Sequence, residues 1–174
     1  MRTEYKIFFV VTPIIFGLLY IGLDAGIQVS WAYSYHNFTE IYTDSDIVIR
    51  GVPRTSYQTS FKWETIHQVT ILEMIKGEKP AHIISVSQMG GYHFLNKIVE
   101  PDSFPLYHKG DELILFLKAG ENGNDIKYYS VGGPQGSYEV QESQVFPIGD
   151  RFSSNLITNG TDVSMFIDYL KTIG

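Results

Sequence analysis

Residues 112–117 have the sequence ELILFL, in which five large apolar side chains follow one another. A strand with one face in water alternates apolar and polar residues, so an unbroken apolar run of this length predicts a strand that is buried on both faces. The remaining strands of the predicted fold lie before and after this run in the sequence.

Three strands are predicted before this run, over residues 47–52, 61–75 and 82–88. Pro53 is expected to close the first strand, because proline cannot donate a hydrogen bond to a strand ladder. In the second strand the apolar positions change parity around Ile71 and Leu72. This shift predicts a β-bulge, in which one extra residue turns the following side chains to the other face.

The third strand is expected to direct Ile84 and Val86 inward. A turn is predicted at residues 76–80 and another at residues 120–125, which are rich in glycine, asparagine and aspartate. Residues 92–110 contain two prolines and show no clear period, and we expect a long loop there.

Beyond the run, residues 126–131 are expected to pair back onto the central strand. Residues 132–136, GGPQG, predict a second tight turn. Residues 137–140 and 144–148 then predict a small β-hairpin.

The end of the chain has a helical pattern. The spacing i, i+3, i+4, i+7 of an amphipathic helix is shown by Val163, Phe166, Ile167 and Leu170. We place this helix over residues 161–173, with Thr161 as its N-cap, and expect its apolar stripe to pack on the sheet. Five or six short strands with one terminal helix predict a mainly β fold: a small closed or partly closed barrel, or alternatively a two-sheet sandwich.

The chain begins with a membrane-targeting pattern. Residues 7–23, IFFVVTPIIFGLLYIGL, form an uncharged apolar run after Arg2 and Lys6. As a helix the run would extend about 25 Å, slightly less than the roughly 30 Å of a bilayer core. Basic flanks tend to stay cytoplasmic. We therefore expect residues 1–32 to be a membrane anchor or signal segment and residues 33–174 to be one extracytoplasmic domain.

Two interpretations of this segment stay open. A retained transmembrane helix would tether the domain to the membrane. A cleaved signal peptide would release it, and Ser30, Trp31 and Ala32 have the small–any–small pattern of a cleavage site. Both interpretations place the domain outside the cytoplasm, either membrane-anchored or secreted.

The absence of cysteine limits the chemistry of the chain. It excludes a disulfide framework, a blue-copper centre, a cysteine-ligated zinc or iron–sulfur site, a cysteine nucleophile and a covalent c-type haem. We expect no cofactor. The formal net charge of −6 and the scattered basic residues also argue against nucleic acid as a partner.

Five short blocks together carry a resemblance to known proteins. They are SDIVIRG at residues 45–51, MIKG at 74–77, QMGG at 88–91, KGDELILFL at 109–117 and YSVGGPQG at 129–136. In this layout the chain resembles uncharacterised exported prokaryotic proteins, and is similar to the OB-fold barrel of the netrin-like module and of tissue inhibitors of metalloproteinases. The resemblance implies a barrel and a binding role. Because those inhibitors use an N-terminal cysteine and disulfides, it does not extend to protease inhibition.

Binding residues are expected in the two glycine-rich turns, because loops at the rim of a barrel often carry binding side chains. They are Gln88, Gly90, Gly91, Gly132, Gly133, Pro134, Gln135 and Gly136. The alternative for GGPQG is a turn that needs positive φ and has no other role. A phosphate-binding role is excluded, since no helix follows and the motif contains no lysine.

No residue is predicted to be catalytic, and no G-x-S-x-G motif occurs. None of the five histidines forms a helical metal-binding pair, and His93 and His108, which flank the long loop, are weak metal candidates. Asn37 and Asn159 begin N-glycosylation tripeptides.

Two classes of function follow from these observations. The favoured one is a non-catalytic binding module, anchored to the membrane or exported, that contacts another envelope or membrane protein. The alternative is a small exported enzyme or metal-binding protein that uses the loop over residues 92–110.

Overall fold

A computed structural model describes residues 35–59, 64–94, 97–99, 104–122, 125–148 and 160–174. The anchor or signal segment predicted over residues 1–32 lies outside these residues. The elements in chain order are α2 (Phe38–Asp44), β1 (Ile47–Gln58), β2 (Glu64–Lys76), β3 (Ile83–Met89), β4 (Tyr92–Phe94), β5 (Lys97–Val99), β6 (Glu112–Asn122), β7 (Asp125–Ser130), the 3-10 helix η1 (Gly133–Gly136), β8 (Ser137–Gln141), β9 (Gln144–Pro147), β10 (Thr161–Asp162) and α3 (Val163–Thr172). Among the described residues, no helix is both long enough and apolar enough to cross a bilayer.

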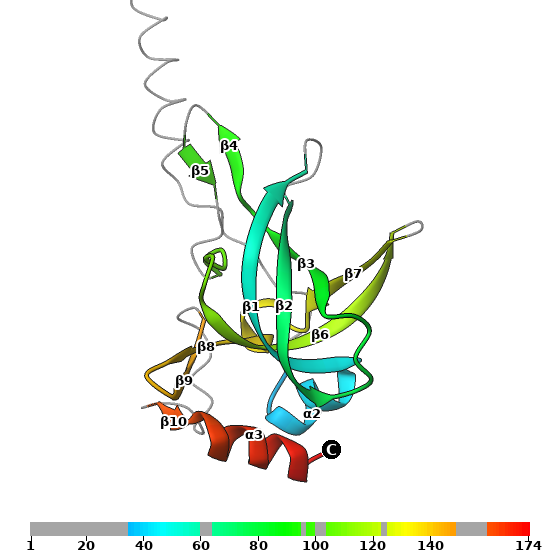
Figure 1. Cartoon of the computed structure of the whole chain (residues 1–174), viewed down its shortest axis with the longest axis vertical. Helices are drawn as coiled ribbons and strands as arrows, with labels where there is room; N and C mark the ends of the chain where they lie inside the picture. The colour runs from blue at the N-terminus through cyan, green and yellow to red at the C-terminus, as the bar shows by residue number, and fades with distance from the viewer. Residues whose placement is uncertain (1–34, 60–63, 95–96, 100–103, 123–124, 149–159) are drawn as a thin grey trace, which may run out of the picture.

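Five strands close into a barrel in the order β1, β2, β3, β7, β6 and back to β1. All these pairs are antiparallel except β3 with β7, which is parallel. The sheet continues from β6 through β8 and β9 to β10. The predicted mainly β barrel with a C-terminal helix is therefore confirmed. Figure 1 shows α2 and α3 at the lower end of the barrel and the β4–β5 pair at the upper end.

The central strand β6 is buried on both faces, as its sequence predicts. Leu113, Leu115 and Leu117 face the barrel interior, where they pack with Val69, Val86 and other residues of β1, β2 and β3. Ile114 and Phe116 face a second core between the sheet and the two helices, which we call the helix-side core. The side chains of these five residues, 113–117, are fully buried.

The predicted bulge in β2 is present. Arg50 pairs with Glu73 and Gly51 pairs with Ile71, so Leu72 is the extra residue and has no partner position on β1. Its side chain is half exposed, while Ile71 is buried. The predicted inward orientation of Ile84 and Val86 on β3 is also confirmed by their burial in the barrel interior.

Two predicted strand ends were wrong. β1 does not end at Pro53 but runs on to Gln58, because the pairing shifts register between Pro53 and Thr55. Such an irregularity accommodates a residue that has no N–H. β6 also continues through Gly120 to Asn122 instead of turning. A Cβ on Gly120 would lie 2.3 Å from the ring of Tyr129, so the aromatic ring covers this glycine and occupies the place of its side chain.

The region predicted as one long loop contains a small sheet of its own. Tyr92 pairs with Val99 and Phe94 pairs with Lys97, which makes β4 and β5 a two-stranded hairpin. Strands of three residues are too short to show a periodic pattern in the sequence, which explains why the hairpin was not predicted.

The C-terminal helix begins two residues later than predicted. Thr161 and Asp162 form β10, where Thr161 pairs with Val145 of β9. Asp162 is the N-cap, and its carboxylate accepts hydrogen bonds from Ser164 N at 2.9 Å and Met165 N at 3.2 Å. Aspartate is among the strongest N-cap residues, and Thr161 is held in the sheet. The predicted apolar stripe of the helix does pack on the sheet, with Val163 only partly buried and the other three positions buried.

Helix α2 was not predicted, although the sequence contains its start signal. Asn37 is the N-cap and its Oδ1 accepts from Glu40 N at 2.9 Å. The helix ends against a cation from another element. Lys76 Nζ of β2 donates to the carbonyl oxygens of Tyr42, Thr43 (3.2 Å) and Ser45 (2.6 Å). A positive charge at a helix C-terminus is favourable, and here it also fixes α2 to the barrel.

The turn between β8 and β9 provides a test of the fold. Gln141 pairs with Gln144, so Glu142 and Ser143 form a two-residue loop with φ of 51° and 66°. Such loops favour Asn-Gly. Replacing both residues (Glu142→Asn with Ser143→Gly) should raise the free energy of unfolding by about 1 kcal/mol, because the left-handed conformation costs non-glycine residues energy.

Urea denaturation of the full chain in detergent measures this change. As the control, the Glu139→Asn variant in strand β8 should have a free energy of unfolding equal to or lower than that of the wild type. A double variant no more stable than the wild type would contradict the turn assignment.

Candidate functional site

A pocket of about 400 Å³ opens at the end of the barrel where β1 ends and β2 begins. We call it the mouth pocket. Its lining consists of Ser56, Tyr57, Gln58, Thr65, His67, Leu106, Tyr107 and His108. Strands β1 and β2 provide one wall. The other is provided by the segment Phe104 to Tyr107, which we call the mouth strap, and by His108 next to it.

His67 is the central residue of this pocket. It lies on the same face of β2 as Val69 and Ile71, which point into the barrel, and its side chain is 1% exposed. Its Nδ1 is 2.8 Å from Ser56 Oγ on the paired strand β1. Its Nε2 is buried and has no hydrogen-bond partner among the described residues. A buried polar atom without a partner is rare in a folded protein, so this one marks an unusual position.

The mouth strap covers His67. The rings of His67 and Tyr107 are 5.1 Å apart, and the ring of Phe104 is 5.8 Å from that of Tyr107. Gln88 at the end of β3 holds the strap through both ends of its amide. Gln88 Oε1 accepts from Tyr107 N at 3.0 Å, and Gln88 Nε2 donates to Pro105 O at 2.7 Å. The Tyr107 hydroxyl lies 2.6 Å from Ser137 Oγ, so the strap is also attached to β8.

The surroundings keep His67 uncharged. Burial lowers the pKa of His67 to about 4, an effect that the Gln88 side chain opposes and the positive charge of His108 adds to. Burial also raises the pKa of Tyr107 to about 12. At neutral pH the rings of His67 and Tyr107 are therefore neutral, and the buried part of the pocket favours an apolar or uncharged polar group.

The Ser56 and His67 pair resembles the start of a catalytic dyad, but its electrostatics do not favour nucleophilic catalysis. A general base works best when its pKa is near the working pH. If His67 took the proton of Ser56, the imidazolium would carry a buried N–H at Nε2 without an acceptor. No described carboxylate orients this ring, as the third member of a triad would.

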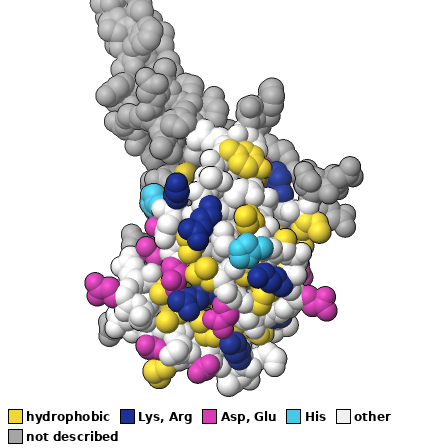
Figure 2. Space-filling model, viewed as in Figure 1, with side chains coloured by type: hydrophobic (Ala, Val, Ile, Leu, Met, Phe, Trp, Pro, Cys, Tyr) yellow, Lys and Arg dark blue, Asp and Glu magenta, His cyan; other side chains and the backbone are white. Residues whose placement is uncertain are grey.

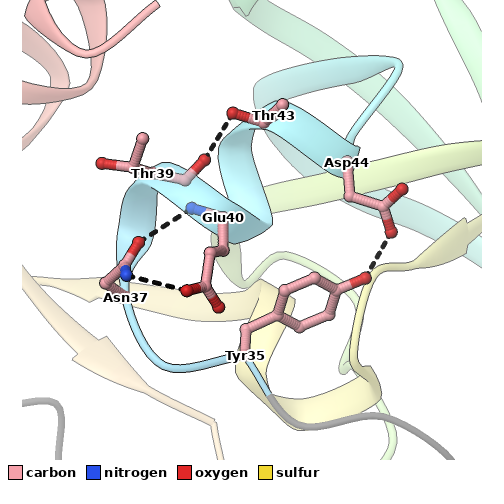
Figure 3. A pocket seen from close by; sticks show the side chains of 6 residues that line it. All are labelled: Tyr35, Asn37, Thr39, Glu40, Thr43 and Asp44. Carbon is pink, nitrogen blue, oxygen red and sulfur yellow. Dashed lines mark hydrogen bonds between the residues drawn. The ribbon is translucent and has the colours of Figure 1, made fainter.

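A second, wider pocket of about 820 Å³ lies beside α2. Figure 3 shows its lining residues, Tyr35, Asn37, Thr39, Glu40, Thr43 and Asp44. Most of these side chains are bonded to their own helix or to one another, and Asp44 also accepts from Lys118 of β6. Asn37 Nδ2 donates to Glu40 Oε1 at 3.0 Å, and the Tyr35 hydroxyl donates to Asp44. The pocket thus outlines a capped helix, and its polar groups serve that helix.

The two glycine-rich turns lie mostly below the surface. Gln88, Gly90 and Gly91 are buried, as are residues 133–136, and Gly132 is half buried. Gly91 lies against the mouth pocket, because a Cβ at this position would be 2.0 Å from Thr65 Oγ1 and 3.2 Å from Leu106. Gly132 has a φ of 65°, the left-handed conformation that a glycine permits.

Gln135 has a structural contact of its own. Its Oε1 accepts from Tyr35 N at 3.0 Å and thereby fixes the backbone where the described chain begins. Tyr107 connects the two turn regions, through its amide to Gln88 and through its hydroxyl to Ser137, which follows Gly136. A binding role for the two turns stays a prediction.

The two histidines proposed for a metal are not brought together in a described site. His108 is largely exposed, lines the mouth pocket and lies 3.4 Å from Asp111 Oδ2. His93 belongs to β4, whose side chains are outside the description. Among the described residues, no three histidine or acidic side chains lie close enough to hold a metal ion.

Of the glycosylation candidates, Asn37 is exposed at the N-cap of α2, and Asn159 lies outside the described residues.

Sequence reasoning missed His67, although a signal for it exists. In an alternating strand, residue 67 has the same parity as Trp63, Val69 and Ile71, so its side chain belongs to the apolar face. The mouth strap had no comparable signal, because its contacts with Gln88 and Ser137 are made between distant parts of the chain.

Comparison with known proteins adds no further assignment: no family model, curated protein or solved structure matches the chain.

The neutral state of His67 predicts a pH dependence of stability. An unfolded histidine has a pKa of about 6.5, against about 4 in the folded protein. Between these values the unfolded chain binds more protons, so the free energy of unfolding should fall by about 3 kcal/mol as the pH drops from 6.5 to 4. Above pH 6.5 the contribution is fully present.

Denaturation curves of the full chain at pH 7, 5.5 and 4 measure this dependence. In a His67→Gln variant the component of about 3 kcal/mol should be missing. A His108→Gln variant, which alters an exposed histidine of the same pocket, should keep it. If all three proteins lost stability equally on acidification, the account of His67 would be wrong.

Proposed function

We propose that the chain is a non-catalytic binding module, membrane-anchored or exported, whose mouth pocket receives a side chain of a partner protein. The observation that carries this proposal is the preformed mouth pocket with Tyr57 at its edge. The side chain of Tyr57 is 52% exposed, although it is one of the large apolar residues of β1. Exposed aromatic residues beside a pocket are typical anchors of protein interfaces.

The topology supports a more specific fold within this proposal. Numbered by their order within the barrel, the strands run 1-2-3-5-4 and back to 1, and strands 3 and 5 are parallel. This arrangement favours an OB-like barrel, a fold that is widely used for binding. It supports the proposed similarity to the netrin-like module. Because the chain has no cysteine, the proposal does not include inhibition of a metalloproteinase by thiolate chelation.

The chemistry of the pocket indicates what the partner provides. Leu106 and the rings of Tyr57 and Tyr107 supply apolar surface, while Ser56 and Gln58 supply uncharged polar groups. Both His67 and Tyr107 are neutral at pH 7. An aromatic or aliphatic side chain of the partner fits this lining better than a charged one, which would lose its hydration without an opposite charge.

The surface charge supports a protein partner over nucleic acid. On the face shown in Figure 2, the basic side chains are interspersed with acidic and uncharged ones. Binding to a phosphate backbone requires a concentrated basic footprint. The net charge of −6 points the same way.

The location of the module is proposed from residues 7–23 and the basic residues before them. The retained-anchor form predicts a full-length intact mass in the membrane fraction. The cleaved form predicts a mature chain that begins at Tyr33, after Ala32. Intact-mass measurement on fractionated cells separates the two forms, and full-length protein in the cytosol would contradict both.

The binding role is tested by affinity capture from mild detergent with tagged full-length protein. Tyr57→Ala should reduce the amount of a stoichiometric partner at least tenfold, because truncation of an anchoring aromatic residue costs about 1.4 kcal/mol or more. Tyr129→Ala removes a comparably exposed tyrosine (39%) from β7 and should leave capture unchanged. A solitary wild-type monomer, or equal capture by Tyr57→Ala, would reject the proposal.

A further inference from the structure

His67 is held at the barrel mouth in a state that depends on the strap above it. Its ring is 1% exposed and its Nε2 has no partner among the described residues. The ring of Tyr107 covers it at 5.1 Å. If the strap moved away, water would reach Nε2 and accept a hydrogen bond from its N–H. The geometry therefore makes the charge of His67 and the position of the strap mutually dependent.

Among the groups that face His67, only the side chain of Gln88 favours a positive charge, and its effect is smaller than that of burial. From β1 it meets Ser56, with Tyr57 lining the same pocket, and from β3 it meets Val86, the residue paired with it, and Gln88. The strap contributes Tyr107, and His108 beside it adds a repulsive charge when protonated.

The nearest acidic residue along β2 is Glu64, and it is already occupied. Glu64 accepts a hydrogen bond from Ser87 Oγ at 2.5 Å and lies 3.5 Å from Lys127 Nζ. An imidazolium at position 67 thus has no described carboxylate to pair with, and solvent is the remaining source of stabilisation.

The strap can separate from the barrel without breaking a strand ladder. Residues 104–108 belong to neither a helix nor a strand. Among the contacts of the strap, Tyr107 N and Pro105 O are bonded to the side chain of Gln88, and the Tyr107 hydroxyl is bonded to Ser137. Lifting the strap breaks these bonds and uncovers the rings of Phe104 and Tyr107, which are 2% and 5% exposed and belong to the barrel-interior core. The cost stays local, because the strand ladders of the barrel remain paired.

We propose that the mouth strap is an acid-operated gate: protonation of His67 lifts the strap, dismantles the mouth pocket and releases the partner. This inference rests on the proposed function, since it concerns the regulation of the same pocket. At neutral pH the uncharged ring keeps the strap down and the pocket formed. In acid the charged ring is stable only when solvated, so the open form gains population.

The size of the effect follows from the two protonation equilibria. In the closed form the pKa of His67 is about 4, and in the open, solvated form it returns to about 6.5. Between these values the ratio of open to closed strap rises by about 80-fold, and over a wider pH range it approaches a limit of about 300-fold.

Amide hydrogen exchange on the full chain in detergent tests the gate without a partner. After correction for the intrinsic rate, protection of the Tyr107 amide, which donates to Gln88, should fall between pH 6.5 and 4 by up to about 80-fold, while residues 113–117 of β6 stay protected. The His67→Gln variant should show no such selective loss, and His108→Gln should behave like the wild type. In the wild type alone, the imidazole resonance of His67 should shift over the same pH range as the exchange.

Three results would overturn the gate: unchanged protection of the strap, loss of protection in strap and β6 together, or the same loss in His67→Gln. A second arm concerns the partner. Complex captured at pH 7 is washed at pH 4.5, and the fraction retained is compared within each variant. The wild type should release its partner and His67→Gln should retain what it captured. Failure to capture any partner at pH 7 rejects the proposed function, while the exchange arm still decides the gate.

Discussion

The whole domain depends on the burial of β6 from two sides. Its leucines complete the interior of the barrel, and Ile114 and Phe116 form the surface of the sheet on which both helices pack. The same strand is bonded to β1, β7 and β8, so it closes the barrel and also begins the extension of the sheet. A polar residue at any of its five central positions would be buried without a partner, which is among the most destabilising of substitutions.

The second core follows from this arrangement. Phe38 of α2 and Phe166 of α3 meet with ring centroids 5.3 Å apart, and both contact Tyr138 of β8. These rings cover the outer face of β6 in place of water. Lys76 of β2 also fixes α2, through the carbonyl oxygens at the end of the helix. A chain without disulfides is thus stabilised by two apolar layers that share one strand.

The parts of the fold that sequence predicts are those with a local pattern. The apolar run of β6, the parity shift at Leu72 and the stripe of α3 all depend on neighbouring residues, and all three are present. The start of α3 and the ends of β1 and β6 were wrong because distant partners decide them. Thr161 is held by β9, and Gly120 is covered by Tyr129.

The glycine-rich turns were recognised as turns, but their burial depends on contacts such as that between Gln135 and Tyr35. For the site, the parity of residue 67 was available in the sequence, while the strap above it depends on Gln88, Ser137 and the closed barrel.

The closure of the barrel also sets a kinetic condition. Ile47 pairs with Leu117, and the parallel pairing of Ser85 with Lys127 is likewise non-local. Contacts between residues so distant in the chain require large loops to close before they contribute any stabilisation, and such topologies fold slowly, in milliseconds to seconds. Until residues 112–130 are available, β1, β2 and β3 form an open meander with two unpaired edges. The apolar run of β6 is therefore made after β1, β2 and β3, and the pairing of β6 with β1 and of β7 with β3 removes the two edges that these strands expose.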